Sequence, residues 1–380
     1  MAVAGGRVVT TGEPGARRLD CTGADVVPGA VCAHTHLYSG LVPFGMPPPA
    51  PPPGSFLQIL ERVWWRLDRA LDAESLRAAA RDAVARALLA GTTTVVDHHE
   101  SPEFIEGSLE VLARACEELG IRSLLCYGAT ERNGGPAEAR RGLEECRRIA
   151  PSPTRRPLVG LHASFTVSDG TLREAGRLAR ELGTVVHVHV AEDMADVLDA
   201  RGRGAPGPLE RMLAQDALPP GSILAHGVHL SPEEVELVNR AGLWLVQNPR
   251  SNEGNRVGYP RALRFGERVA LGTDGWVADM AVEEAALLRL AGDAGDERAA
   301  GRLAAGHALV AGAFGAAPAP LAEGALADVV VRDGRGVRHV VVDGRVVVED
   351  GRLVTGDPDE ITRTAQREAV RLWQRMESIR

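Results

Sequence analysis

The chain has 380 residues, of which 44% are hydrophobic and 25% are charged, the ordinary mixture of a globular protein. Its net charge of −8 excludes a general electrostatic attraction to nucleic acid or to an anionic membrane. All 43 basic residues are arginine, so a lysine Schiff base and a metal pair bridged by a carbamylated lysine are both excluded.

The five cysteines form no CxxC pair and no even-numbered framework, which favours a reducing compartment. The chain shows no signal-peptide pattern at its start and no apolar run long enough to cross a membrane. We therefore expect a cytoplasmic protein that is neither secreted nor inserted in a membrane.

From about residue 28 the chain alternates short β-rich runs with helical stretches, the pattern of consecutive βα units and a parallel sheet. Eight such repeats predict an α/β protein with a (β/α)₈ TIM-type barrel over residues 28–321. An open doubly wound sheet is the alternative, although no GxGxxG or GxxxxGK[ST] motif follows the first run. The predicted strands are Ala30–His34, Thr92–Asp97, Ile121–Tyr127, Leu158–His162, Thr184–Val190, Ser222–His226, Leu243–Gln247 and Arg268–Leu271.

The two ends of the chain differ from this middle part. Residues 1–27 contain only short β-like pieces between glycines, and residues 322–354 contain short β-runs with Asp-Gly turn signals. We predict that these two segments pair into a small β-sandwich beside the barrel. Residues 355–380 are predicted to form a C-terminal helix whose apolar stripe packs on the barrel or takes part in a dimer contact.

Histidines and acidic residues stand at the C-terminal ends of four predicted strands. His34 and His36 are two residues apart, so both imidazoles lie on one face of the first strand. Alone, such an HxH pair is more often a pair of satisfied polar side chains. His189 ends the fifth run, His226 ends the sixth, and Asp274 follows the eighth. Because barrel chemistry is located at this end of the strands, the positions together predict a metal site.

The types of side chain indicate their roles. Imidazole and carboxylate ligands suit Zn²⁺ or Fe²⁺, and a bound ion of this kind lowers the pKa of water to about 7. Glu192 lies three residues beyond His189 and is predicted to shuttle a proton, while His226 stabilises developing charge and Asp274 also accepts the proton of water. We predict one divalent ion per chain, Zn²⁺ first and Fe²⁺ as the alternative, held by His34, His36, His189 and Asp274.

Residues near the same strand ends are predicted to contact the substrate: His98, His162, Ser164 and Asn252. Of His98 and His99 at the end of the second run, only one can face the barrel interior, and hydrogen bonding behind the metal ligands is the alternative role. Asn252 follows the seventh run, where it either positions the substrate or holds the loop.

The segments around these residues resemble the amidohydrolase superfamily, in particular its deaminase and chlorohydrolase branch and most closely the aminohydrolases of the SsnA type. The HxH, HxxE, AH and GTDG motifs carry the resemblance to the superfamily, and matching segments run from about residue 28 to residue 332. Trp64–Asp68 and Asp97–Pro102 carry the resemblance to the subgroup. The resemblance implies a (β/α)₈ barrel with a β-sandwich, one metal on the ligands given above, and Glu192 and His226 acting on the substrate.

These observations predict a hydrolase of non-peptide carbon–nitrogen bonds that deaminates a small nitrogen heterocycle by attack of metal-bound hydroxide. Hydrolytic dechlorination of a triazine-like ring uses almost the same residues and is the alternative within the enzyme class. A barrel that binds a metal or a partner without catalysis is the alternative from another class. We expect a small heterocyclic substrate and a homodimer, with no nucleic acid and no membrane as partners.

Overall fold

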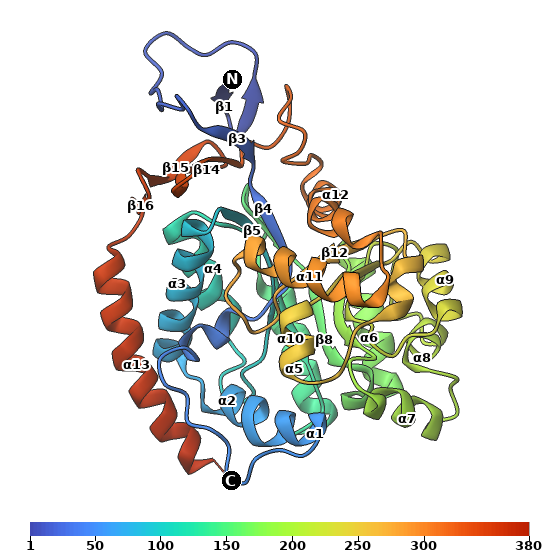
Figure 1. Ribbon diagram of the computed structural model, residues 1–380. Coiled ribbons are helices and arrows are strands. Elements are labelled where there is room, and N and C mark those ends of the chain that lie inside the picture. Colours follow the sequence, from blue (N-terminus) through green and yellow to red (C-terminus); the bar gives the residue numbers. More distant parts are fainter. Residues whose placement is uncertain (380) are drawn as a thin grey trace.

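The computed structural model describes residues 1–379 and places a sheet of parallel strands inside a ring of helices (Figure 1). The strands follow one another around this sheet in chain order, and the short β7 (Arg155–Pro157) pairs with β6 beside it. Every residue of β5 and β6 is buried, as expected of parallel strands that are covered on both faces. The barrel strands are β4 (Ala30–Thr35), β5 (Thr92–His99), β6 (Arg122–Ala129), β8 (Val159–Ala163), β9 (Val186–Val190), β10 (Ile223–His226), β11 (Trp244–Gln247) and β12 (Val269–Leu271).

The first and last strands of the sheet meet and close the barrel. Thr35 of β4 forms a parallel bridge with Asp274, which follows β12. The backbone N–H of His36 donates to the carbonyl of Asp274 (3.2 Å), and the N–H of Thr273 donates to the carbonyl of His34 (2.9 Å). The predicted barrel is thereby confirmed against the open sheet, and each of the eight predicted runs overlaps one strand.

Helices cover the outside of the barrel (Figure 1). Their apolar stripes face the strands. In α3, for example, Leu76, Val84 and Leu88 are fully buried. Asp72 caps α3 by accepting from the N–H of Ser75. The helices of the ring are α3 (Ala73–Leu89), α4 (Ser108–Leu119), α5 (Pro136–Arg148), α6 (Asp169–Glu181), α7 (Met194–Gly202), α8 (Pro208–Ala214), α9 (Pro232–Arg240), α10 (Pro249–Gly254), α11 (Met280–Ala294) and α12 (Arg302–Phe314).

Between β4 and α3 the chain runs across the C-terminal ends of the strands. It forms a 3₁₀ turn at Leu37–Leu41 and then α1 (Phe56–Ile59), which continues through a π-helical turn at Leu60–Trp64 into α2 (Trp65–Ala70). Ser55 caps α1 by accepting from the N–H of Gln58. This segment brings two tryptophans to the rim of the barrel.

The two ends of the chain form a separate antiparallel sheet at the other end of the barrel (Figure 1). A hairpin of β1 (Ala2–Ala4) and β2 (Arg7–Val9) joins it through a bond from the N–H of Val8 to the carbonyl of Ala325 (2.9 Å). The small β-domain made by the N- and C-terminal segments is thus confirmed. In order its strands are β16 (Arg352–Leu353), β15 (Arg345–Glu349), β14 (Gly336–Val342), β13 (Val329–Asp333) and β3 (Asp25–Pro28).

The C-terminal helix α13 (Pro358–Ser378) runs along one side of the barrel beside α3 (Figure 1). Its indole at Trp373 donates from Nε1 to the carbonyl of Phe44 (3.1 Å), and Arg371 pairs with Asp72 at the start of α3 (2.8 Å). Within residues 1–379, no helix combines the length and the apolar character that a membrane crossing needs.

Candidate active site

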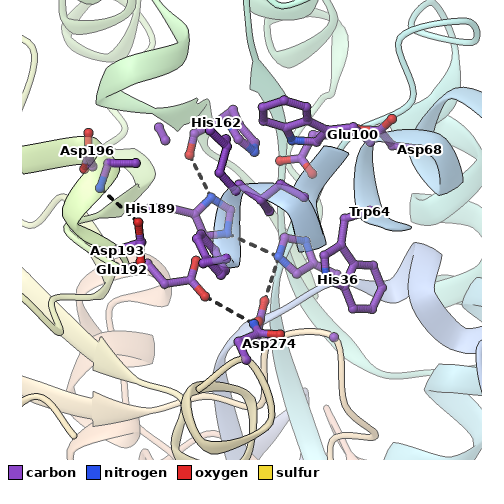
Figure 2. A pocket seen from close by; sticks show the side chains of 18 of the residues that line it. His36, Trp64, Asp68, Glu100, His162, His189, Glu192, Asp193, Asp196 and Asp274 are labelled. Carbon is purple, nitrogen blue, oxygen red and sulfur yellow. Dashed lines mark hydrogen bonds and ion pairs between the residues drawn. The ribbon is translucent and has the colours of Figure 1, made fainter. Parts of the chain in front are cut away.

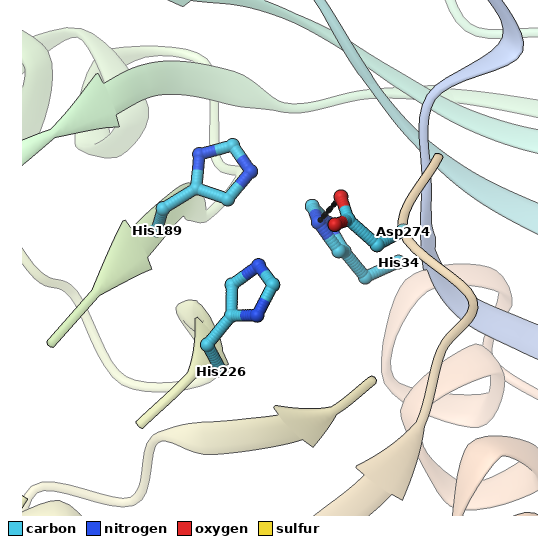
Figure 3. Close-up of side chains that lie close together, drawn as sticks. All are labelled: His34, His189, His226 and Asp274. Carbon is cyan, nitrogen blue, oxygen red and sulfur yellow. Dashed lines mark ion pairs between the residues drawn. The ribbon is translucent and has the colours of Figure 1, made fainter. Parts of the chain in front are cut away.

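A cluster of imidazoles and one carboxylate lies where the barrel strands end (Figure 3). His34 and His36 come from the end of β4, His189 from β9 and His226 from the last residue of β10. One ligand atom from each of His34, His189, His226 and Asp274 lies within 4.8 Å of the others. His36 joins the cluster, because its Nε2 is 2.9 Å from Asp274 Oδ1 and 3.2 Å from His189 Nε2. The structure therefore brings together all the predicted metal ligands and His226.

Each imidazole of the cluster has a hydrogen-bond partner at its Nδ1 atom. A histidine whose Nδ1 donates to a carbonyl keeps the lone pair of its Nε2 free, so these contacts aim the Nε2 atoms at the centre of the cluster. The Nδ1 contacts are His36 with the carbonyl of His98 (2.5 Å), His189 with the carbonyl of His162 (2.7 Å), His226 with Asn252 Oδ1 (2.9 Å) and His34 with His187 Nε2 (3.0 Å).

The centre of the cluster fits a divalent metal ion. Among the described residues, the buried Nε2 atoms of His34 and His226 have no hydrogen-bond partner. An unpaired buried polar atom is destabilising by about 1–3 kcal/mol unless a ligand satisfies it. Neutral nitrogens together with one carboxylate form the donor set that Zn²⁺ and Fe²⁺ prefer.

Burial keeps the imidazoles of His34 and His189 neutral. It lowers the pKa of His34 to about 3 and holds the pKa of His189 well below its usual range. Burial opposes ionisation of Asp274, but the nearby imidazoles of His34 (Nε2 at 3.4 Å) and His36 (Nε2 at 2.9 Å) outweigh it and hold the pKa of this carboxyl well below its ordinary value. Burial also acts to lower the pKa of His36, but its contact with Asp274 outweighs burial and raises this pKa to about 9. The cluster thus combines the neutral imidazoles of His34 and His189 with an ionised carboxylate.

The backbone is unusual at the ends of three strands. Ala191, His226 and Asp274 have positive φ angles of 48°, 76° and 54° although none is glycine. Such conformations are destabilising by about 1–3 kcal/mol each and occur most often at functional sites, where the surrounding structure imposes them. At His226 and Asp274 the turn directs the side chain toward the cluster (Figure 3).

Glu192 stands beside the cluster without belonging to it (Figure 2). Its Oε2 lies 3.6 Å from His226 Nε2, and its Oε1 accepts from Asn255 Nδ2 (3.4 Å). Burial raises the pKa of this carboxyl to about 7, against the opposing charge of His226. A group with this pKa can both take up and release a proton near neutral pH.

His36, His189, Glu192 and Asp274 line a cleft of about 790 Å³, open solvent at its mouth included, while the fully buried His34 and His226 are not part of its lining (Figure 2). Trp64, Trp65 and Phe165 provide aromatic walls. Apart from histidine, the ionisable side chains that line it are all acidic or phenolic: Tyr38, Asp68, Glu100, Glu192, Asp193, Asp196 and Asp274.

The residues predicted to contact substrate lie in different places. His162 lines the cleft. His98 lies beneath the cluster, with Nε2 3.0 Å from the carbonyl of Leu161 and Nδ1 2.9 Å from Glu100. The Oγ of Ser164 accepts from Arg211 Nη1 (3.1 Å), away from the cleft lining, and Asn252 stands behind His226.

Four acidic residues of the cleft were not among the predicted site residues: Asp193, Asp196, and the two described next, Glu100 and Asp68. Glu100 accepts from the Tyr38 hydroxyl (3.2 Å). It comes directly after β5, two residues beyond His98, so the two-residue period of a strand would have placed it on the same face as His98. Asp68 accepts from Arg132 Nη2 (2.8 Å), and it lies one helical turn after Trp64 and Trp65. Both belong to segments already identified for their resemblance.

Comparison with known proteins identifies the family. A protein-family model described as the amidohydrolase family matches residues 26–347, most of the chain. The chain belongs to the amidohydrolase family. The predicted superfamily is thus confirmed.

Curated relatives of this amidohydrolase are deaminases. The 5'-deoxyadenosine deaminase of Methanopyrus kandleri is 30% identical over 88% of this chain and 84% of its own length. The 5-methylthioadenosine/S-adenosylhomocysteine deaminase of Natronomonas pharaonis is 30% identical over 98% of this chain and 93% of its own. The family, these relatives and the metal-competent cluster show a metal-dependent hydrolase of the deaminase branch, as the sequence predicts.

Solved structures share the fold of the amidohydrolase. An adenosine deaminase from Xanthomonas campestris with bound zinc superposes with a TM-score of 0.80 at 23% identity, over 92% of this chain and 86% of its own. Atrazine chlorohydrolase from Arthrobacter aurescens, complexed with zinc, superposes with a TM-score of 0.75 at 21% identity, over 91% and 88%. At these identities the similarity shows that the barrel fold is shared.

Proposed function

We propose that the protein removes the exocyclic amino group from the adenine ring of a nucleoside. The observation that carries the proposal is the convergence of the imidazole Nε2 atoms and Asp274 beside Glu192, at the bottom of an aromatic cleft. The names of the curated relatives, which are deaminases of 5'-deoxyadenosine and 5-methylthioadenosine, support this substrate class.

The proposed ion is one Zn²⁺ per chain, with Fe²⁺ as the alternative. When bound, such an ion polarises a water molecule and lowers its pKa, which makes the water nucleophilic at neutral pH. His226 lies in the same cluster, but its Nε2 also faces Glu192 at 3.6 Å, so we assign it to the substrate. The proposed ligands are His34, His36, His189 and Asp274.

The remaining groups handle protons and charge. A water molecule adds to the ring carbon that carries the amino group, and Asp274 accepts a proton from this water. Glu192 passes a proton to the departing nitrogen, for which its raised pKa is suited. The Nε2 of His226 faces the charge that develops at the reacting carbon. Ammonia leaves and the ring keeps a carbonyl group.

The far end of the cleft is suited to a sugar. Asp68 lies at the opposite end of the cleft from Glu192 (Figure 2), and its Oδ1 has no hydrogen-bond partner among the described residues although the side chain is only 2% exposed. Arg132 holds the other oxygen of this carboxylate, so Oδ1 is free to accept from a hydroxyl. Trp65 and Phe165 are placed to contact the flat ring, and we propose His162 as a further contact.

The other predicted contacts act through their neighbours in this proposal. His98 supports His36 through its carbonyl, and Asn252 orients His226. Ser164, which bonds to Arg211, stays a prediction as a substrate contact. Because the cleft is lined by carboxylates and by no arginine, we expect nucleosides to bind and phosphorylated nucleotides to be rejected.

Three further statements belong to the proposal. We expect a homodimer in the cytoplasm, with residues 28–321 as the catalytic barrel and residues 1–27 and 322–354 as the small β-domain. Within the deaminase branch we assign the chain to the SsnA type. Light scattering of the purified protein gives its mass in solution, and the mass of one chain contradicts the dimer.

The test is an ammonia-release assay on protein of measured zinc content, with adenosine, 5'-deoxyadenosine, 5-methylthioadenosine, AMP and atrazine. We expect ammonia from the nucleosides, little from AMP, and no chloride from atrazine. Chloride release without ammonia supports dechlorination and contradicts the proposal. Asp68→Asn should raise KM for nucleosides far more than it lowers kcat, because the carboxylate lies away from the reacting carbon.

A further inference from the structure

A second chamber adjoins the active site on the other side of Asp274. It has a volume of about 1180 Å³, open solvent at its mouth included. Val42 and Met46 line it from the loop after β4, Ala83 lines it from α3, and Trp276 lines it from the segment before α11. None of these four residues lines the substrate cleft.

The two chambers share one wall, which is formed at the centre of the site. His36, Trp64 and Asp274 line both of them, and so does Gly275. A Cβ placed on Gly275 lies 3.5 Å from the Trp64 ring and 3.7 Å from the Ser39 hydroxyl, so the glycine keeps the wall thin at this position. The second chamber therefore adjoins the cleft beside Asp274, and Asp68 does not line it.

The chemistry of the second chamber suits an uncharged group. Beyond the shared wall with His36 and Asp274, its charged residues are Asp82 and Arg86, which pair with each other at 2.6 Å. The ring of Trp276, which is 52% exposed, stands at the chamber and stacks near the Arg250 guanidinium (5.5 Å). An aliphatic or aromatic substituent of a ligand would find apolar walls there.

We propose that this chamber holds the substituent of an alkylated leaving group, so that the enzyme also hydrolyses N⁶-alkyl adenine nucleosides. The inference rests on the proposed function and extends its substrate class. A sugar at the Asp68 end lies away from the chamber, whereas a group attached to the exocyclic nitrogen lies at the shared wall. Only a substituent on that nitrogen can therefore enter the second chamber while the ring occupies the cleft.

The reaction balances with water as the only co-reactant. The carbon–oxygen bond to water forms, and the bond between the ring carbon and the exocyclic nitrogen breaks. One proton of the water goes to the departing nitrogen, which leaves as a primary amine, R–NH₂. The other proton of the water is transferred to a ring nitrogen, and the ring of the product carries a carbonyl group.

The test compares adenosine with its N⁶-methyl, N⁶-ethyl and N⁶-propyl derivatives, and measures the amine that is released. Each buried methylene contributes about 0.8 kcal/mol, which corresponds to a rise in kcat/KM of up to about fourfold for each methylene added from N⁶-methyl to N⁶-propyl. Ala83→Leu fills the chamber and should lower the ratio of kcat/KM for N⁶-propyladenosine to that for adenosine about tenfold or more. Met46→Trp fills the same chamber from a loop and serves if the first variant does not fold.

Ala195→Leu is the matched control, because Ala195 lines only the substrate cleft. This variant should leave the ratio between the two substrates unchanged. Turnover of adenosine without turnover of its alkylated derivatives overturns the inference and leaves the proposed function intact. Equal losses for both substrates in Ala83→Leu also overturn it.

A binding measurement separates failure of the inference from failure of the proposed function. If no nucleoside is deaminated, tryptophan fluorescence of the zinc-loaded protein is titrated with adenosine and with N⁶-propyladenosine. Tighter binding of the propyl derivative that is lost in Ala83→Leu supports the chamber as its subsite. Equal binding, or no binding of either compound, overturns the inference.

Discussion

Two clusters of buried polar side chains lie at opposite ends of the barrel strands. At the start of β6, Arg122 is fully buried, and its Nε and Nη2 donate to the two carboxylate oxygens of Asp328 (2.7 and 3.0 Å). Its Nη1 donates to the carbonyl of Pro153 (3.0 Å), and its Nη2 also contacts Asp343 (3.1 Å). At the other end of the strands, the Nε2 atoms of His34 and His226 are buried without a partner among the described residues.

The difference between the two clusters distinguishes a structural role from a functional one. A buried charge whose three guanidinium nitrogens all have hydrogen-bond partners joins the barrel to the small β-domain and requires no ligand. A buried cluster with unpaired atoms, left-handed backbone at non-glycine residues and an adjacent cleft is complete only with a ligand. In (β/α)₈ enzymes the same division separates the stabilising N-terminal face from the catalytic C-terminal face.

The largest expected effect on activity comes from removing the proton-transferring side chain beside the histidine cluster. Glu192→Gln keeps the shape of the side chain but not its ability to transfer a proton, so turnover should fall by about 10²–10⁴-fold. Metal content should stay at the wild-type level, because Glu192 is not among the proposed ligands. Glu236→Gln, at a side chain that is 68% exposed, is the control and should be active. Near-normal activity of Glu192→Gln would refute the shuttle role.

Substitutions in the cluster around Arg122 should change the stability of the protein. Arg122→Met leaves Asp328 buried without its partner, so the free energy of unfolding should fall by about 3–5 kcal/mol, measured by urea denaturation. Arg141→Met removes an exposed pair with Glu106 and should change the free energy of unfolding by less than about 1 kcal/mol. Equal effects of the two variants would contradict the structural role of Arg122.

A residue that acts through a catalytic group should have a smaller effect. Asn252→Ala removes the acceptor of His226 Nδ1 (2.9 Å) and frees the ring to turn, so kcat should fall by about 10–100-fold. Metal content and KM should change little. Asn239→Ala, whose side chain bonds to the carbonyl of Phe265 on the surface, is the matched control. If Asn252→Ala changes only KM, Asn252 contacts the substrate and does not act through His226.

The smallest expected effect tests the packing beneath the cleft. A Cβ at Gly128 would collide with the His98 ring and lie 2.6 Å from Glu100 Oε1, so Gly128→Ala should lower the free energy of unfolding by about 1–3 kcal/mol. Gly170→Ala, in the first turn of α6 where a Cβ would lie in ordinary contact with Ser168 Oγ (3.5 Å), should stabilise the protein by up to about 1 kcal/mol. The same sign for both variants would contradict this account.

The strands and the histidine cluster could be predicted from the sequence, because both follow from local rules. Period-two and helical patterns give the βα repeats, and parallel strands place His36, His189 and His226 at one end of the sheet. The bonding of Ser164 could not be predicted in this way, because its partner Arg211 lies 47 residues away on another helix. The pair of Asp68 and Arg132, 64 residues apart, was missed for the same reason.

The most direct test of the central claim is the metal content of the purified protein, measured by inductively coupled plasma mass spectrometry together with deaminase activity. We expect about one equivalent of zinc or iron per chain, loss of both metal and activity with a chelator, and recovery with added Zn²⁺. His189→Gln and Asp274→Asn should hold well below one equivalent, while Glu192→Gln keeps its metal. Wild-type protein that holds no ion and deaminates nucleosides in the presence of the chelator would contradict the claim.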